Sequence, residues 1–215
     1  MPSRRTLIAL MAASLAASGL LAACDRAPTP VAGDEEMFLG KADAPITLIE
    51  YASVACSHCA NWNNDVLPQF KAKYIDTGQV KLVTREFHAG DPTFSAAGFL
   101  LARCAGKDKY FEVTDAIYEQ QQEIASSGDL IGGLERIGRE VAGLTPQQVR
   151  ACLTDPEMVD AQNKRIDRYI REHNIDGTPT FVIGNEVVGS GFIDMAGMDA
   201  IIASAKAKAQ GGTPS

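Results

Sequence analysis

The residues of this chain most able to do chemistry are two cysteines, Cys56 and Cys59, which are separated only by Ser57 and His58. A pair with this spacing can hold part of a metal site, close a structural disulfide, or exchange disulfides with other thiols. The thiolate is the form of cysteine that reacts in such an exchange. The surroundings that the fold gives to Cys56 therefore decide which chemistry the pair performs.

The sequence argues against a metal site or a structural disulfide at this pair. A structural zinc needs about four ligands, whereas the chain has only three histidines, His58, His88 and His173, and no second cysteine pair close in sequence. Haem attachment needs a histidine directly after the second cysteine, where Ala60 stands. A disulfide that spans only two residues at the start of a helix would be strained and easily reduced, so it would stabilise the fold poorly. We expect no metal and no cofactor, although copper binding by the thiolates and an imidazole stays open.

The two cysteines lie where a strand is expected to pass into a helix. Residues 46–52 (ITLIEYA) form a short apolar run with β-branched residues, which predicts a buried strand. The stretch from Ser57 to about Ile75 predicts a helix, with a kink at Pro68. Large apolar side chains recur there every four residues, at Trp62, Val66, Phe70 and Tyr74.

A helix that begins beside Cys56 would favour an anion there, because its first N–H groups are unpaired and its dipole is positive at that end. We expect this position to lower the pKa of the Cys56 thiol, and the imidazole of His58 to stabilise the thiolate further. Cys59 would lie one turn into the helix and be more buried. The spacing thus predicts an exposed attacking sulfur and a shielded sulfur that resolves the bond formed with a partner.

The remaining elements complete a mixed fold. Residues 80–87 predict a second strand, parallel to the first because a helix connects the two. Helical patterns fill about 91–174, and strand character returns as a hairpin at 180–183 and 187–190. A last helix is expected over about 194–208. The order predicts an α/β fold of β-α-β, then an all-helical insertion, then β-β-α.

Length and composition suit one globular domain, since 46% of the 215 residues are hydrophobic and 22% are charged. The formal net charge of −7 argues against nucleic acid as a partner. No patch has the density of lysine and arginine needed to neutralise a run of phosphates.

The N-terminal 23 residues have the pattern of a secretory signal peptide. Arg4 and Arg5 precede an apolar run that is shorter than a usual membrane span. The run closes with LAAC at Cys24, which resembles the cleavage box of bacterial lipoproteins. That resemblance implies that Cys24 becomes the first mature residue and carries lipid on its sulfur, with Asp25 weakly favouring the inner membrane. An uncleaved anchor and plain secretion remain as alternatives.

Export would place the other four cysteines in an oxidising compartment, where they could form two pairs. Residues 24–36 are polar and rich in proline, so we expect a lipid-anchored linker that holds the domain, residues 37–208, off the membrane. Residues 209–215 are expected to form a disordered tail.

Taken together, IEYASVACSHC, a kinked helix, a helical insertion and IDGTPTFVIGNEVVGSG resemble the DsbA-type thiol–disulfide oxidoreductases of the thioredoxin superfamily, over residues 37–208. The resemblance implies a thioredoxin-like fold in which Thr178 and Pro179 join through a cis bond that faces the cysteines. Thr178 would then pair through its backbone with an extended substrate. Ser57-His58 departs from the Pro-His common in the family, which leaves the redox potential open.

The same resemblance assigns further residues. Glu50, six residues before Cys56, matches a buried acid that takes or relays the proton of the resolving cysteine, although a water-facing Glu at the sheet edge remains an alternative. Some relatives carry a second disulfide where Cys104 and Cys152 lie, on the apolar faces of two expected helices. Two free buried thiols are the alternative there.

We expect the protein to be a membrane-tethered periplasmic oxidoreductase, which donates the Cys56–Cys59 disulfide to exported proteins with cysteine thiols. Such an enzyme needs a membrane redox partner that resets its disulfide. A periplasmic disulfide reductase is the alternative within the same chemistry. A copper-binding thioredoxin-like lipoprotein and a chaperone-like module without redox turnover are alternatives from other classes.

Overall fold

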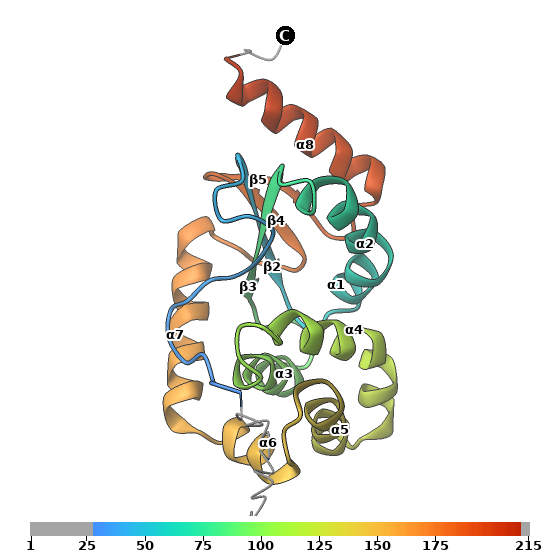
Figure 1. Cartoon of the computed structure of the whole chain (residues 1–215), viewed down its shortest axis with the longest axis vertical. Helices are drawn as coiled ribbons and strands as arrows, with labels where there is room; N and C mark the ends of the chain where they lie inside the picture. Colours follow the sequence, from blue (N-terminus) through green and yellow to red (C-terminus); the bar gives the residue numbers. More distant parts are fainter. Residues whose placement is uncertain (1–27, 212–215) are drawn as a thin grey trace, which may run out of the picture.

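A computed structural model describes residues 28–211 of the chain, which form a mixed five-stranded sheet with helices on both faces (Figure 1). The strand order is β1-β3-β2-β4-β5. The strands are β1 (Met37–Leu39), β2 (Ile46–Ala52), β3 (Val80–Glu86), β4 (Thr180–Ile183) and β5 (Glu186–Ser190). This architecture confirms the thioredoxin-like α/β fold with a helical insertion.

The central strand β2 joins the two halves of the sheet. It pairs in parallel with β3 from Ile46↔Val80 to Ala52↔Glu86, and antiparallel with β4 on its other side. The short strand β1 extends the sheet antiparallel to β3 and was not predicted, because three residues are too few to show an alternation. The functional end of β2 is therefore held by a strand on each side.

The helix after β2 runs to Ile75 but is not a regular α-helix. It comprises α1 (Ser57–Asn61), the π-helical turn η1 (Trp62–Val66), α2 (Leu67–Phe70) and a second π-helical turn η2 (Lys71–Ile75). The first π-helical turn ends at Val66, two residues before Pro68, whose ring nitrogen cannot donate a hydrogen bond and where the kink was expected. The apolar face of this whole helical stretch packs on the sheet, together with α8 (Met195–Ala209).

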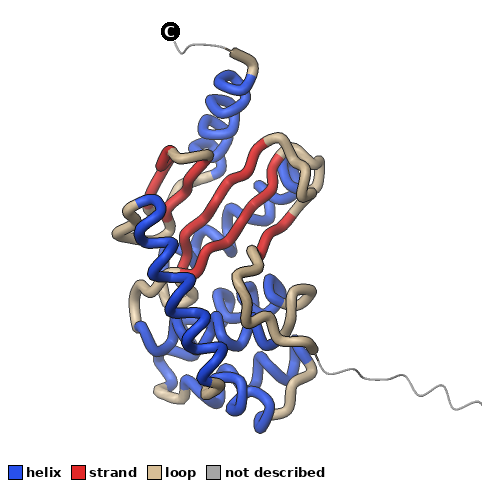
Figure 2. The backbone as a smooth tube through the Cα atoms, turned by 90° about the vertical axis from the view of Figure 1, so that its left-hand side faces the viewer, coloured by secondary structure: helices blue, strands red, loops and turns tan. Residues whose placement is uncertain are grey.

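The insertion between β3 and β4 consists of five helices. They are α3 (Pro92–Cys104), α4 (Tyr110–Ser127), α5 (Leu130–Ala142), α6 (Pro146–Leu153) and α7 (Pro156–His173). Helices α3 to α6 gather at one end of the sheet around their own core, whereas α7 crosses the face opposite α8 (Figures 1 and 2). Every one of these helices except α4 starts with an Asp or Thr side chain that caps it, as at Thr145, which forms a capping box with Gln148.

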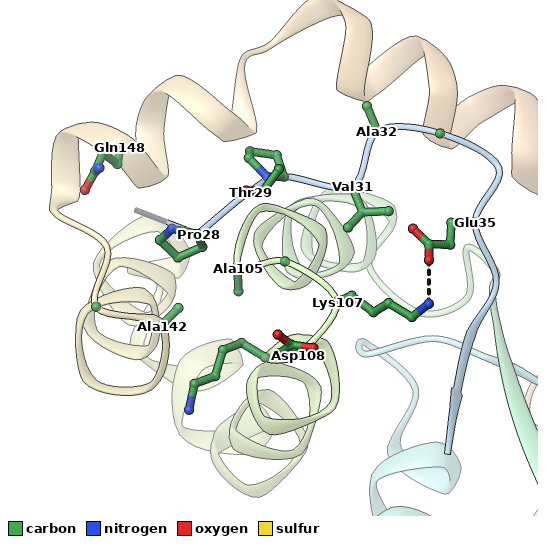
Figure 3. A pocket seen from close by; sticks show the side chains of 15 residues that line it. Pro28, Thr29, Val31, Ala32, Glu35, Ala105, Lys107, Asp108, Ala142 and Gln148 are labelled. Carbon is green, nitrogen blue, oxygen red and sulfur yellow. Dashed lines mark hydrogen bonds and ion pairs between the residues drawn. The ribbon is translucent and has the colours of Figure 1, made fainter. Parts of the chain in front are cut away.

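Residues 28–36 belong to the stretch that was expected to be a lipid-anchored linker, and they contact the domain. This segment, here called the strap, lies along the helices of the insertion (Figure 3). Arg103 donates to the carbonyl oxygens of Val31, Gly33 and Glu35, and Arg165 donates to those of Ala32 and Gly33, at 2.8–3.4 Å. Both guanidinium groups also pair with Glu86, and all three side chains are almost completely buried. The strap stays in place because it satisfies buried charged donors that have few other acceptors.

None of the helices in the described part of the chain is long and apolar enough to cross a membrane. The predicted signal peptide, Cys24 and Asp25 lie outside the described residues. A cavity of about 940 Å³ lies between the strap and the turns before α4 and α6, and none of the predicted site residues lines it.

Candidate active site

Cys56 occupies the N-cap position of α1, in the turn that follows β2. Its backbone is extended there, with φ −92° and ψ 122°. Its N–H donates to the Ser53 carbonyl oxygen at 3.0 Å, and its own carbonyl oxygen accepts the first helical hydrogen bond from Ala60 at 3.0 Å. The Cys56 side chain is half-buried, whereas Cys59 is completely buried behind it. The structure thus agrees with the predicted pair of one accessible and one shielded sulfur.

The surroundings of Cys56 lower the pKa of its thiol from 9.0 to about 5. The largest cause is a hydrogen bond from Cys59, followed by partial burial, which opposes it. Hydrogen bonds from the Thr178 side chain and from the backbone N–H groups of Cys59 and His58 lower the pKa further. The helix start therefore acts on Cys56 as expected.

His58 acts on the Cys56 thiol through its backbone. The His58 side chain is exposed, and it is the backbone N–H of this residue that helps to lower the pKa of Cys56. A helix N-terminus presents backbone N–H groups whatever the side chain. Within the described residues the two cysteines are free thiols, and no cluster of three or more His, Cys, Asp or Glu side chains is suited to a metal ion.

Thr178 and Pro179 face the cysteine pair from the opposite side. The peptide bond between them is cis, and the Cys56 thiol donates to the Thr178 carbonyl oxygen at 3.3 Å. In this thiol form the buried Thr178 hydroxyl finds no partner among the described residues. When Cys56 is a thiolate, the hydroxyl can donate to the sulfur, which explains how this side chain lowers the pKa of Cys56.

Glu50 lies buried on β2, six residues before Cys56, and not at a water-facing edge. Burial, together with the nearby charges of Cys56 and Asp115, raises the pKa of its carboxyl group from 4.5 to about 8. Burial, the hydrogen bond to Cys56 and the charge of Glu50 raise the pKa of Cys59 well above its ordinary value. The neighbourhood therefore holds a protonated carboxyl group near a sulfur that resists ionisation.

Sequence reasoning missed the contacts that hold the turn from Ser53 to Cys56. The buried Ser53 hydroxyl lies 2.7 Å from the Ala89 carbonyl oxygen and 2.9 Å from the Ser95 hydroxyl. It also accepts from the N–H of Ala55 at 3.2 Å. A single serine after a strand carries no signal that could have identified this role.

Cys104 and Cys152 form a disulfide that joins α3 to α6, with their Cα atoms 6.3 Å apart. This is the pairing that the resemblance implied, and the separation is ordinary for a disulfide. The bond lies in the helical insertion. Cys56 and Cys59 are therefore free to pair with each other.

Comparison with known proteins agrees with this geometry. A family model described as thioredoxin matches residues 33–204. The chain belongs to the thioredoxin superfamily, in its DsbA-type branch. The crystal structure of Wolbachia pipientis alpha-DsbA1 is similar, with a TM-score of 0.71 and 26% identity, over 86% of this chain and 96% of that one.

Two relatives in sequence carry related names. A Rickettsia bellii protein, provisionally named a protein-disulfide oxidoreductase, is 33% identical over 70% of this chain and 57% of its own length. Disulfide bond formation protein D of Bacillus subtilis is 25% identical over 70% of this chain and 68% of its own length. The chain thus spans little more than half the length of the Rickettsia relative.

Proposed function

We propose that this protein is a periplasmic protein-disulfide oxidoreductase, tethered to a membrane by lipid on Cys24, which donates its Cys56–Cys59 disulfide to exported proteins. One observation carries the proposal: an accessible sulfur with a pKa of about 5 lies in front of a buried sulfur whose pKa is raised. Stabilising the Cys56 thiolate stabilises the reduced form, and a disulfide whose reduced form is stabilised is a good oxidant.

The first step of the reaction forms a mixed disulfide. A substrate thiolate attacks Cys56 Sγ, the Cys56–Cys59 bond breaks, and the electron pair leaves on Cys59 Sγ. Because the Cys59 thiolate is poorly stabilised, it needs a proton as it forms, and protonated Glu50 is the nearby acid that supplies it.

The second step releases the oxidised substrate. A second substrate thiolate attacks the substrate sulfur bound to Cys56, and Cys56 leaves as a thiolate. A thiolate of low pKa is a good leaving group, so the same surroundings favour this step. The substrate has lost two electrons, and the cysteine pair has gained them. A membrane redox partner must then remove those electrons, and Glu50 must regain a proton.

The substrate would bind beside Thr178 and Pro179. The Thr178 backbone lies next to the Cys56 sulfur, where an extended peptide could pair with it as an added strand. This arrangement would hold a substrate cysteine in front of Cys56 without requiring a particular sequence, which suits an enzyme with many exported clients.

The redox potential of the pair tests the oxidising direction. We expect equilibration with glutathione to give a value more oxidising than that of thioredoxin, which is about −270 mV. Wild-type protein should oxidise a reduced dithiol peptide, whereas Cys56→Ser and Cys59→Ser, which have no disulfide to donate, should not. A potential at or below that of thioredoxin would contradict donation, and turnover by Cys56→Ser would contradict the role of this sulfur.

The membrane tether is tested separately. When cells that express the full chain are grown with radiolabelled palmitate, the wild-type protein should become labelled and Cys24→Ser should not. The variant should also be lost from the membrane fraction. Labelling that persists in Cys24→Ser would contradict lipidation at this residue without bearing on the redox chemistry.

A further inference from the structure

The turn that carries Cys56 is fixed from two sides by elements distant in sequence. On one side the loop after β3 approaches closely, since a Cβ added to Gly90 would lie 2.4 Å from the Ala55 carbonyl oxygen. On the other side lies α4, from which Gln121 reaches the turn. The first contact is close packing, whereas the second consists of directed hydrogen bonds.

Gln121 uses one amide group to hold two carbonyl groups of this turn. Its Nε2 donates to the Val54 carbonyl oxygen at 2.7 Å and to the Cys56 carbonyl oxygen at 3.1 Å. Carbonyl oxygens only accept hydrogen bonds, so both neighbours require the NH₂ end of the amide at this place. An NH₂ group has two hydrogens, and both are used here.

The Cys56 carbonyl oxygen is a sensitive point for such a contact. It is the N-cap acceptor, which also receives the first hydrogen bond of α1 from the N–H of Ala60. Its orientation therefore sets the start of the helix, including the N–H groups of His58 and Cys59 that favour the Cys56 thiolate. No residue of α1 itself caps this start, because no side-chain hydrogen bond is made at the N-cap.

We propose that Gln121 is a positioning residue for the reaction, which holds the N-cap turn so that the N–H groups of His58 and Cys59 point at Cys56 Sγ. The contact should matter more to the reduced form than to the oxidised form. The thiolate needs those N–H groups, whereas a sulfur in a disulfide carries no charge. The proposal rests on thiol–disulfide exchange at Cys56 and not on its direction in the cell.

The test compares Gln121→Met with Gln122→Met. Methionine keeps a side chain of similar length but has no donor, and Gln122 is the exposed neighbour on the same helix. The measurements are the ionisation of Cys56, from thiolate absorbance in the reduced protein, and the redox potential against glutathione. For Gln121→Met we expect about tenfold weaker ionisation, a pKa rise of about one unit, and a potential about 30 mV more reducing. Gln122→Met should match the wild type in both.

A second variant separates positioning from stability. Gln121→Asn keeps the amide but is one methylene shorter, so it should shift ionisation and potential in the same direction. If Gln121→Met and Gln121→Asn lower the melting temperature and leave both quantities unchanged, Gln121 is only structural and the proposal is wrong. A wild-type potential as low as that of thioredoxin, together with a shift in Gln121→Met, would reject donation and keep this inference.

Discussion

At the scale of single residues, Glu50 links the fold to the chemistry. Its carboxyl group is buried on the central strand, and this burial keeps it protonated to about pH 8. Burial and the charge of Glu50 raise the pKa of Cys59, so in the proposed reaction Glu50 is the acid that would supply the proton to this sulfur. Cys56, one helical turn from Cys59, is instead favoured as a thiolate by the hydrogen-bond donors around its sulfur.

The variant Glu50→Gln should change how stability depends on pH. The folded state keeps a proton on Glu50 up to about pH 8, whereas the unfolded chain loses it near pH 4.5. The free energy of unfolding of the wild type therefore falls as the pH rises from about 4.5 to about 8. Glutamine does not titrate, so the variant does not lose this stability. In urea unfolding of the oxidised protein, we expect the variant to gain about 1 kcal/mol or more over the wild type at pH 8.

At pH 4 the two proteins should unfold at similar urea concentrations, because Glu50 is then protonated in both states. The variant should also form the mixed disulfide more slowly, since glutamine has no proton to give. An unchanged pH profile of stability would contradict the buried, protonated carboxyl group.

The residues of the site were predictable to different degrees. Cys56 and Cys59 carry their own signal, and the strand-to-helix transition around them fixed which sulfur would be exposed. The backbone N–H of His58, which lowers the pKa of Cys56, could not be identified in advance, because backbone N–H groups act without any mark in the sequence. Gln121 could not be found, since its contact joins residues 65 positions apart and a glutamine on a helix surface is ordinary.

At the scale of elements, the insertion is held together by its own core and by one covalent bond. The Cys104–Cys152 disulfide closes a loop of 48 residues between α3 and α6. Loop closure restricts the unfolded chain, and the two helices also pack against each other in the folded protein. The insertion in turn supplies α4, which supports the turn that carries Cys56.

Replacing both of these cysteines with alanine should lower the free energy of unfolding by about 2–4 kcal/mol. Urea unfolding of the double variant Cys104→Ala/Cys152→Ala against the wild type measures this loss. The potential of the Cys56–Cys59 pair should stay the same, because the disulfide joins α3 to α6 within the insertion and is not among the groups that shift the pKa of Cys56. A changed potential would mean that the disulfide acts on the active site through α3 or α4.

Sequence patterns located the long elements well and the short ones poorly. The run at residues 46–52 and the four-residue repeat that follows it matched the observed strand and helix. The π-helical turns before and after α2 were missed, because a period of 4.4 residues cannot be told from 3.6 over five residues. Strand β1 forms only through its pairing with β3, which a local pattern does not show.

At the scale of the whole molecule, the buried cluster of Glu86, Arg103 and Arg165 connects the sheet, the insertion and the strap. Two buried cations face one buried anion, so the carbonyl oxygens of the strap supply the remaining acceptors. The strap was interpreted as a linker because acceptors on the backbone leave no trace in composition. Only the burial of the two arginines reveals that it is needed.

A chain that begins at Met37 should therefore be less stable than one that begins at Pro28. Removing the strap leaves buried guanidinium N–H groups without acceptors, and we expect a loss of about 3 kcal/mol or more in urea unfolding. The loss should be smaller in a short chain that also carries Arg165→Met. Equal stability of the chains that begin at Pro28 and Met37 would show that the strap contributes nothing to the fold.

The ionised state of Cys56 also fixes how many hydrogen ions accompany each electron pair. Around neutral pH, reduction of the pair delivers two electrons but takes up one hydrogen ion, because Cys59 becomes a thiol while Cys56 does not. The midpoint reduction potential of this couple then falls by about 30 mV for each unit that the pH rises. The potential of a dithiol that binds two protons on reduction falls by about 59 mV per unit. Relative to such ordinary thiols, the protein becomes a stronger electron acceptor as its surroundings turn alkaline and a weaker one as they acidify.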